Sequence, residues 1–256
     1  MIFDSHAHYN DSKFNEDREQ VLKGLTTENV AFVMNVADSM KSLPKVMEIA
    51  EGYPFIYAAV GVHPEETGEL CQNDMDILLE YTKHPKVKAI GEIGLDYYWD
   101  SVERSVQKRW FARQIDLAKE VKLPIIVHDR EAHGDTVDIL RSEKANEAGG
   151  IVHCFSGSRE MARDVLDLGM YIGIGGTLTF KNARKIKEVA EYVPLESIVL
   201  ETDAPYLAPE PFRGKRNNSA LIRYVIEELA KIKGISKELV EETTFKNAMK
   251  CYRIEE

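Results

Sequence analysis

Short apolar runs rich in β-branched residues alternate with longer amphipathic runs along the whole chain. Several of the short runs, such as Val30–Val36, are apolar at nearly every position, which is typical of strands buried on both faces of a sheet. The longer runs repeat their apolar residues with a helical period, as in Ser105–Val121. The predicted strands are Met1–Phe3, Val30–Val36, Phe55–Val62, Val87–Ile93, Pro124–Val127, Gly150–His153, Met170–Gly175 and Ile198–Leu200.

Signals for helix ends support the helical runs. Ser158 stands where an N-cap residue is expected, and Gly169 follows the same run where a C′ glycine is expected. Ser236 opens the last helical run as a capping serine. Helices are predicted over Ser105–Val121, Thr136–Arg141, Ser158–Leu168, Asn182–Tyr192, Ala220–Ile232 and Ser236–Tyr252.

Eight strands that alternate with helices in 256 residues are the pattern of an α/β protein with a single (β/α)8 TIM barrel. We expect one domain over residues 1–256, with the last helix as a C-terminal addition. An open doubly wound sheet is the alternative, but it usually carries a glycine-rich phosphate turn after its first strand, where this chain has His6-Ala-His8. The longest irregular stretch, Pro205–Asn218, follows the eighth strand, on the face where barrel loops carry function.

The composition is that of an ordinary soluble globular protein, with 44% hydrophobic and 30% charged residues. The 3 cysteines have no paired spacing, so no disulfide framework is predicted. Cys154 follows His153 in a predicted strand, so we expect a buried structural thiol that faces away from it. No apolar run approaches the roughly 20 residues that span a membrane, and the N-terminus lacks a basic signal-peptide region. A cytoplasmic protein without membrane association or a stable protein partner is predicted.

The net charge of −10 argues against non-specific wrapping of nucleic acid, because that mode of binding needs a basic face. It does not exclude a phosphate-containing substrate. A site that holds two divalent cations is locally positive, whatever the net charge of the whole protein.

Metal-binding types of side chain stand at the carboxyl ends of predicted strands. His6 and His8 are two residues apart, so in a strand they point to the same face and can hold one ion. The carboxyl ends of barrel strands converge on one mouth, so residues from different strands should meet there. Four imidazoles and two carboxylates are too many for one tetrahedral ion with an open position, and they suit two ions bridged by a carboxylate. The candidate ligands are His6, His8, Glu92, His128, His153 and Asp203.

These residues lie in segments that resemble the signatures of TatD-type metal-dependent deoxyribonucleases. The segments are Asp4-Ser-His-Ala-His, Gly61-Val-His-Pro, Gly91-Glu-Ile-Gly-Leu-Asp-Tyr, Val127-His-Asp-Arg, His153-Cys-Phe-Ser-Gly, Glu201-Thr-Asp-Ala-Pro-Tyr-Leu and Arg213-Gly-Lys-Arg-Asn. The resemblance spans essentially the whole chain. One departure is visible, because the family commonly has Arg-Asn-Glu-Pro where this chain has Arg216-Asn-Asn-Ser.

The resemblance implies a metallohydrolase of the amidohydrolase-like superfamily that hydrolyses phosphodiester bonds of DNA. It implies one or two divalent ions, with zinc, manganese and magnesium all open. By the same resemblance, His6, His8 and Asp203 hold one ion, His128 and His153 hold the other, and Glu92 bridges them.

The predicted activity is that of an exonuclease acting on single strands or ends of DNA through a metal-activated water. Asp203 is the candidate general base, and Glu92 is the second catalytic candidate. Glu201 lies two residues before Asp203 on the same strand face, so we expect it to orient a ligand histidine from behind. Candidate substrate-binding residues are the basic, aromatic and histidine side chains near strand ends, namely His63, Arg130, Tyr206, Arg213, Lys215 and Arg216.

Two other functions stay open. A related hydrolase on the same scaffold would cleave a small amide, lactone or phosphotriester, and many such enzymes bridge their metals with a carboxylated lysine on strand four. Here Glu92 stands at the end of that strand and Lys88 lies earlier in it, which favours the nuclease type. A non-catalytic metal-binding or scaffolding protein would bind nucleic acid in the presence of metal and leave it intact.

Overall fold

The eight strands form one parallel sheet in sequence order, which nearly closes into a barrel. The computed structural model describes residues 1–99 and 101–255. The first and last strands meet through a bridge between Ala7 and Ala204 and a hydrogen bond of 2.9 Å from Asp203 N to His6 O. The predicted TIM barrel is thus confirmed. The strands are β1 (Ile2–Ala7), β2 (Val30–Val36), β3 (Ile56–Val60), β4 (Val87–Asp96), β5 (Ile125–Arg130), β6 (Gly150–Val152), β7 (Tyr171–Ile174) and β8 (Ile198–Leu200).

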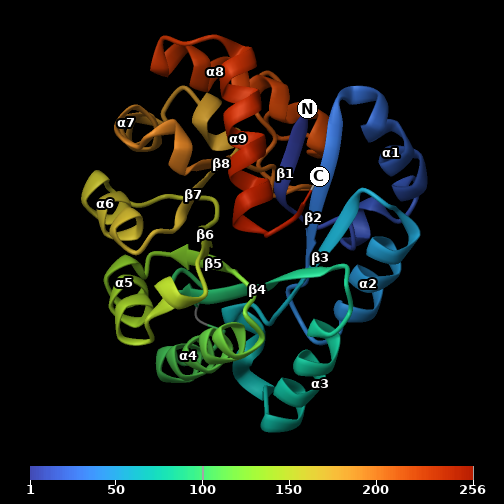
Figure 1. Ribbon diagram of the computed structural model, residues 1–256, viewed down its shortest axis with the longest axis vertical. Helices are drawn as coiled ribbons and strands as arrows, with labels where there is room; N and C mark the ends of the chain where they lie inside the picture. The colour runs from blue at the N-terminus through green and yellow to red at the C-terminus, as the bar shows by residue number, and fades with distance from the viewer. Residues whose placement is uncertain (100, 256) are drawn as a thin grey trace.

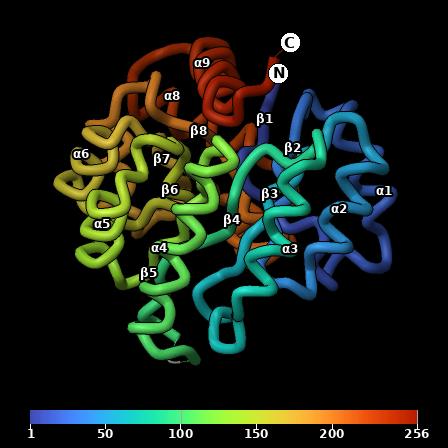
Figure 2. The backbone as a smooth tube through the Cα atoms, turned by 60° about the horizontal axis from the view of Figure 1, so that its bottom comes forward, coloured from blue at the N-terminus to red at the C-terminus, as the bar shows by residue number. Residues whose placement is uncertain are grey.

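Helices surround the strands, as Figures 1 and 2 show. Ser158 caps its helix by accepting a hydrogen bond from Met161 N, and Gly169 after that helix has a φ of 68°, as the sequence predicts. All six predicted helices are present with small changes at their ends, and three more precede them. The helices are α1 (Arg18–Leu25), α2 (Leu43–Gly52), α3 (Gln72–Thr82), α4 (Arg104–Val121), α5 (His133–Ser142), α6 (Arg159–Asp167), α7 (Arg184–Tyr192), α8 (Ile222–Lys233) and α9 (Lys237–Cys251).

Three strands, β1, β4 and β5, run further than their apolar patterns predict. The prediction ends β4 at Ile93, whereas the structure continues it to Asp96, paired with Arg130 of β5. The cause is that these strand ends carry polar residues that face the barrel mouth, so hydrophobicity stops before the backbone pairing does. The functional residues of β4 and β5 therefore sit in the hydrogen-bonded sheet and not in a loop.

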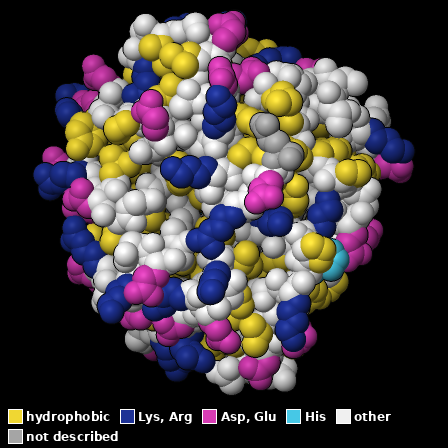
Figure 3. Space-filling view, viewed as in Figure 1, with side chains coloured by type: hydrophobic (Ala, Val, Ile, Leu, Met, Phe, Trp, Pro, Cys, Tyr) yellow, Lys and Arg dark blue, Asp and Glu magenta, His cyan; other side chains and the backbone are white. Residues whose placement is uncertain are grey.

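The C-terminal helix α9 closes the end of the barrel where the strands begin. Phe245 and Met249 of α9 and the following Tyr252 belong to one buried cluster with side chains from the strands. The Tyr252 hydroxyl also donates to Ser5 O at 2.7 Å. Figure 2 shows α9 with both chain termini at one end of the molecule, and Figure 3 shows charged side chains of both signs interspersed over that face. A cavity lies at the opposite end of the barrel, at the carboxyl ends of the strands. The strand residues of this cluster are Phe3, Met34, Val36, Ala59, Ala89, Ile126, Ile151 and Val199.

Along several strands, apolar side chains of this inner cluster are followed by polar side chains at the barrel mouth. In β5, β6 and β8, a polar residue follows two positions after a residue of the inner cluster and so shares its face. These pairs are Ile126 and His128, Ile151 and His153, and Val199 and Glu201. In β1 and β4 the register shifts between Asp4 and Ala7 and between Ile90 and Ile93. Such irregularities change the direction in which side chains point. His6 and Glu92 lie within these two spans.

Within the described residues, no helix has the length and apolar character needed to cross a membrane.

Candidate metal centre and its cavity

Four donor atoms meet where β1 and β8 end. His6 Nε2 and His8 Nε2 lie 2.9 Å apart, and Asp203 Oδ1 lies 3.6 and 3.5 Å from them. Glu92 Oε2 is 3.5 Å from each of the two nitrogens. The second ring nitrogen of His8, Nδ1, lies 3.0 Å from the carbonyl oxygen of Val36 and therefore carries the proton, which leaves Nε2 free to bind a metal.

The spacing of these donors fits one four-coordinate ion. A tetrahedral ion with ligands at about 2.1 Å holds them about 3.4 Å apart, and the separations here run from 2.9 to 3.6 Å. Two imidazole nitrogens and two carboxylate oxygens suit zinc, manganese and similar divalent ions. We call this set the first donor group.

A second donor group lies on the other side of Glu92. His128 Nδ1 and His153 Nε2 are 2.8 and 2.6 Å from Glu92 Oε1 and 3.4 Å from each other. His128 Nε2 lies 2.9 Å from Asp96 Oδ2. Burial would lower the pKa of His128, but the carboxylates of Asp96 and Glu92 outweigh it and raise that pKa to about 10. Because Nε2 is held by Asp96, Nδ1 is the nitrogen that would lose its proton to bind a metal. His63 Nε2 stands 3.9 Å from Glu92 Oε1 and is the next nearest nitrogen. Three donors with room for more suit an ion that also binds substrate.

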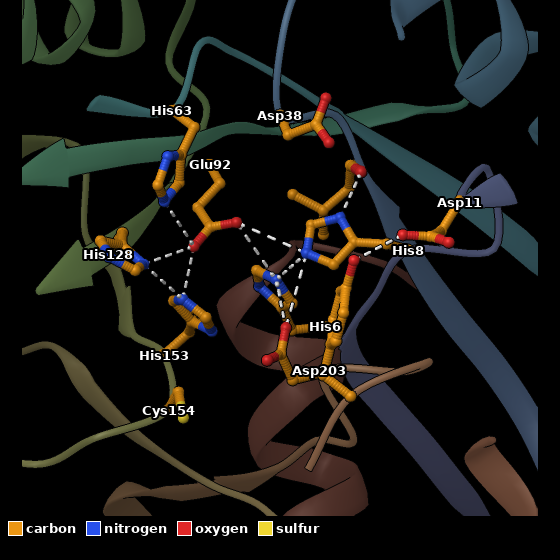
Figure 4. A network of polar contacts seen from close by, with 12 residues as sticks. His6, His8, Asp11, Asp38, His63, Glu92, His128, His153, Cys154 and Asp203 are labelled. Carbon is orange, nitrogen blue, oxygen red and sulfur yellow. Dashed lines mark hydrogen bonds and ion pairs between the residues drawn. The ribbon is translucent and has the colours of Figure 1, made fainter. Parts of the chain in front are cut away.

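Glu92 connects the two groups. Figure 4 shows its carboxylate between the imidazoles of His6 and His8 on one side and those of His128 and His153 on the other. The residue is only 4% exposed. Burial alone would raise the pKa of Glu92, but the charges of His153 and His6 and the hydrogen bonds from His128 and His153 outweigh it and hold that pKa well below its usual value. A buried, ionised carboxylate with one oxygen toward each group is the geometry of a bridging ligand.

Asp203 faces both the first donor group and open space. Its Oδ1 is turned toward His6 and His8, while Oδ2 has no hydrogen-bond partner among the described residues. Burial would raise the pKa of Asp203, but the hydrogen bond with His8 and the nearby histidine charges outweigh it and lower that pKa. The site therefore holds an ionised oxygen in position to accept a proton.

Both donor groups border a cavity of about 1000 Å³ at the carboxyl ends of the strands. We call it the metal cavity. Its wall is acidic, and Arg130 is the one Lys or Arg side chain that the described residues contribute to it. The wall residues outside the donor groups include Asp11, Asp38, Glu65, Glu66, Trp99, Asp129, Arg130, Cys154, Ser156, Thr177, Tyr206 and Leu207.

The family model for TatD related DNase matches residues 3–253 of this chain. The chain belongs to the TatD-related DNase family. Relatives in this family are named metal-dependent hydrolases, and the barrel fold of this chain is that of the family.

Individual TatD relatives match over their full length. The uncharacterized metal-dependent hydrolase YabD of Bacillus subtilis (strain 168) is 44% identical over 254 residues, which cover 99% of this chain and 100% of that protein. The crystal structure of YJJV, a TatD homolog from Escherichia coli K12, superposes with a TM-score of 0.93 at 30% identity and covers 99% and 98% of the two chains. The protein named 3'-5' ssDNA/RNA exonuclease TatD of Salmonella typhimurium is 29% identical over 258 residues, 99% of each chain.

Three of the predicted substrate-binding residues of this TatD protein line the metal cavity: His63, Arg130 and Tyr206. The guanidinium of Arg130 lies 3.9 Å from the ring centroid of Tyr98. The Tyr206 hydroxyl donates to Asp11 Oδ2 at 2.7 Å. These side chains are positioned to meet a ligand that enters the cavity.

The three basic residues of the loop after β8 lie in different surroundings. Arg213 borders a smaller cavity beside the metal cavity. Arg216 instead forms two hydrogen bonds with Asp17, at 2.7 and 2.5 Å, and lies over the ring of Phe14. Lys215 is exposed and borders neither cavity. The binding roles of Lys215 and Arg216 stay predictions, and the Asp17 carboxylate already neutralises Arg216.

The sequence analysis missed Asp96, which holds His128 in its ring orientation. The signal was present, because Glu92, Gly94 and Asp96 alternate on one face of β4. The expectation of a buried thiol at Cys154 was wrong, since this side chain is partly exposed and lines the metal cavity. Its φ of 43° takes it out of the strand conformation, so the alternation that turned it away from His153 no longer applies.

Glu201 lies behind both donor groups. Its Oε1 accepts a hydrogen bond from Cys154 N at 2.5 Å and lies 3.8 Å from His153 Nδ1. Burial raises the pKa of Glu201 to about 8. Nδ1 of His6, Nδ1 of His153 and Oε2 of Glu201 are all buried without a hydrogen-bond partner. This arrangement suits the predicted role of Glu201 in orienting ligand histidines, which stays a prediction.

Proposed function

We propose that this protein is a divalent-metal-dependent deoxyribonuclease that hydrolyses phosphodiester bonds from an end of single-stranded DNA. The observation that carries the proposal is the pair of donor groups that share the buried carboxylate of Glu92 at the floor of an open cavity. Sites with two neighbouring ions recur in enzymes that cleave phosphodiesters. The similarity to the protein named 3'-5' ssDNA/RNA exonuclease TatD supports nucleic acid as the substrate.

The donor groups would hold two divalent ions, one at His6, His8 and Asp203 and one at His128 and His153, with Glu92 shared. Zinc, manganese and magnesium all fit this proposal. Bound there, the ions would polarise the phosphoryl group and make a water molecule acidic near neutral pH.

The protein side chains contribute proton transfer and orientation. Asp203 Oδ2 accepts the proton that leaves the attacking water, because it is ionised and has no other partner. Asp96 and the carbonyl of Val36 each accept a hydrogen bond from one ring nitrogen of His128 and His8, so the other nitrogen of each ring would be the one to bind an ion. A fixed donor set lowers the reorganisation needed during the reaction.

Exposed aromatic side chains at the mouth match a single-stranded substrate. Tyr98 and Trp99 are each 50% exposed, and Arg130 lies over both rings at 3.9 and 5.6 Å. Tyr206, also exposed, lines the same cavity. Unpaired bases stack on such rings, and arginine adds contacts to phosphate and to the base face.

The second candidate is a small-molecule hydrolase on the same barrel. Its usual carboxylated lysine has no counterpart at the donor groups, where the bridging position is Glu92. Lys88 lies away from the metal cavity, with its Nζ 5.8 Å from the ring centroid of Tyr57. This favours the nuclease.

The test uses the metal-loaded protein with single strands labelled at either the 3′ or the 5′ end. Expected is a ladder that shortens from one end and stops when a chelator is added. The same preparations are offered small carboxylic esters, lactones and phosphotriesters. Turnover of those compounds with intact DNA would replace the proposal with the small-molecule hydrolase. Metal-dependent DNA binding without cleavage of any substrate would instead indicate a binding protein.

A further inference from the structure

A second cavity of about 380 Å³ lies beside the metal cavity. Cys154, Ser156 and Thr177 line both cavities, so the two cavities adjoin at these three residues. We call the smaller space the side pocket. Because Cys154 follows the ligand His153 directly, the pocket begins next to the second donor group.

The side pocket is apolar where the metal cavity is acidic. Phe155, Phe180 and Ile186 supply its apolar surface, and no carboxylate is among the described residues that line it. Its two cations are Lys185 and Arg213. The guanidinium of Arg213 lies 4.3 Å from the ring centroid of Phe180, so a flat cation and a flat ring stand together at the wall.

Polar groups at the pocket are also available to a ligand. Ser156, Thr177 and Asn182 line it, and their side chains have no hydrogen-bond partner among the described residues. Together they offer hydroxyl and amide groups that both donate and accept. A pocket with an apolar body and a few unpaired polar groups is typical of a site for a small organic ligand.

We propose that the side pocket receives the nucleobase of the nucleotide whose phosphate lies at the metal centre. The inference rests on the proposed function, because it takes the substrate to be a nucleotide chain. A base is flat, mostly apolar on its faces and polar on its edge, which matches Phe180 with Arg213 and the groups of Ser156 and Asn182. The metal centre and the side pocket differ in charge. The phosphate would lie at the cations of the centre, and the neutral base would lie in the side pocket, whose described lining has no carboxylate.

The experiment measures binding to the manganese-loaded protein by isothermal titration calorimetry. The probes are thymidine 3′- and 5′-monophosphate and, without a base, 2-deoxyribose 5-phosphate. The wild-type protein should bind the better nucleotide at least about fivefold more tightly than the sugar phosphate, because base stacking on an aromatic ring is worth at least about that factor. Equal affinity for the nucleotides and the sugar phosphate would overturn the proposal.

Substitutions then test whether the base binds in the side pocket. Phe180→Ala should weaken nucleotide binding about tenfold and leave sugar phosphate binding unchanged. Ala183→Trp, which fills the pocket without removing Phe180, should cause the same selective loss. The matched control is Tyr192→Ala, since Tyr192 is an aromatic residue at the end of helix α7, which begins just after Ala183, and has Arg159 over its ring at 4.8 Å but lines neither cavity. If both pocket variants bind nucleotide like the control, the base lies elsewhere.

Failure of this proposal is distinguishable from failure of the proposed function. The labelled-strand assay reports whether DNA is cleaved at all, whereas the titrations need no turnover. Cleaved DNA with unchanged titrations for the pocket variants removes the base pocket and keeps the nuclease. Intact DNA with base-selective binding removes the nuclease and keeps a nucleotide pocket.

Discussion

Replacing Asp203 by asparagine separates metal binding from proton transfer. The amide oxygen can take the place of Oδ1, which lies 3.6 and 3.5 Å from the nitrogens of His6 and His8, so a donor to the first group remains. The amide nitrogen takes the place of Oδ2, which faces the cavity without a partner. It cannot accept a proton. Metal should therefore still bind at saturation while turnover falls.

Loss of a general base costs about 10²–10⁴-fold in rate, which corresponds to roughly 2.7–5.5 kcal/mol of transition-state stabilisation. The structure argues for the upper part of that range. No other carboxylate oxygen of the first donor group is free, because Glu92 Oε2 faces His6 and His8 and Oε1 faces His128. No second group there can take over the proton.

The assay measures kcat on a labelled single strand together with metal content by mass spectrometry, at a metal concentration that saturates both proteins. Asp38→Asn is the matched control, because Asp38 lines the same cavity but is bound by Ser39 and lies outside both donor groups. Its kcat should change by less than roughly threefold. Near-normal turnover of Asp203→Asn with full metal occupancy would refute the assignment of Asp203 as the base.

The same geometry supports three further predictions. Glu92→Gln should lower the bound metal per chain, measured after desalting, because both donor groups lose their shared charge; undiminished metal would remove Glu92 as a bridge. Chelation should lower the thermal unfolding midpoint, since an ion at 100 times its dissociation constant stabilises a protein by about 2.7 kcal/mol; an equal midpoint with and without metal would argue against a resident ion. Arg130→Ala should flatten the slope of log KM against log salt, by about 0.7 for each phosphate that the protein no longer neutralises, whereas Arg216→Ala should leave it unchanged because Asp17 already neutralises Arg216.

The barrel was predictable because its strands are buried on both faces and alternate with helical runs, two of which open on capping serines, Ser158 and Ser236. The helices α1, α2 and α3 were not predicted. Helix α2 buries five residues, and its burial does not explain why it was missed. Helices α1 and α3 each bury only two residues, Leu22 and Leu25 in one and Met75 and Leu78 in the other. So few buried positions leave a weak pattern in the sequence. Their positions depend on the neighbouring strands, which a local pattern does not contain.

The metal ligands were predictable for a related reason. A strand fixes the direction of every second side chain, so a polar residue two positions after an inner residue such as Ile126 must face the barrel mouth. Loop residues have no such rule. Arg216 meets Asp17 across 199 positions of the chain, and no pattern near either residue shows that the loop folds back in this way. The alternation of side chains along a strand likewise does not predict the positive φ of Cys154.

The acidic wall of the metal cavity affects how this protein, whose net charge is −10, would bind a polyanion such as DNA. Asp11, Asp38, Glu65 and Glu66 border the cavity, so phosphates beyond the reacting one meet like charge there. If the donor groups hold two divalent ions, as proposed, those ions would in contrast form a positive centre at the floor. Attraction is then concentrated on one phosphate, and each additional phosphate near the wall is repelled within a Debye length of about 8 Å. A chain end brings fewer phosphates past the wall than the middle of a strand does. The charge distribution therefore favours cleavage from an end and supports the exonuclease over an enzyme that cuts within a strand.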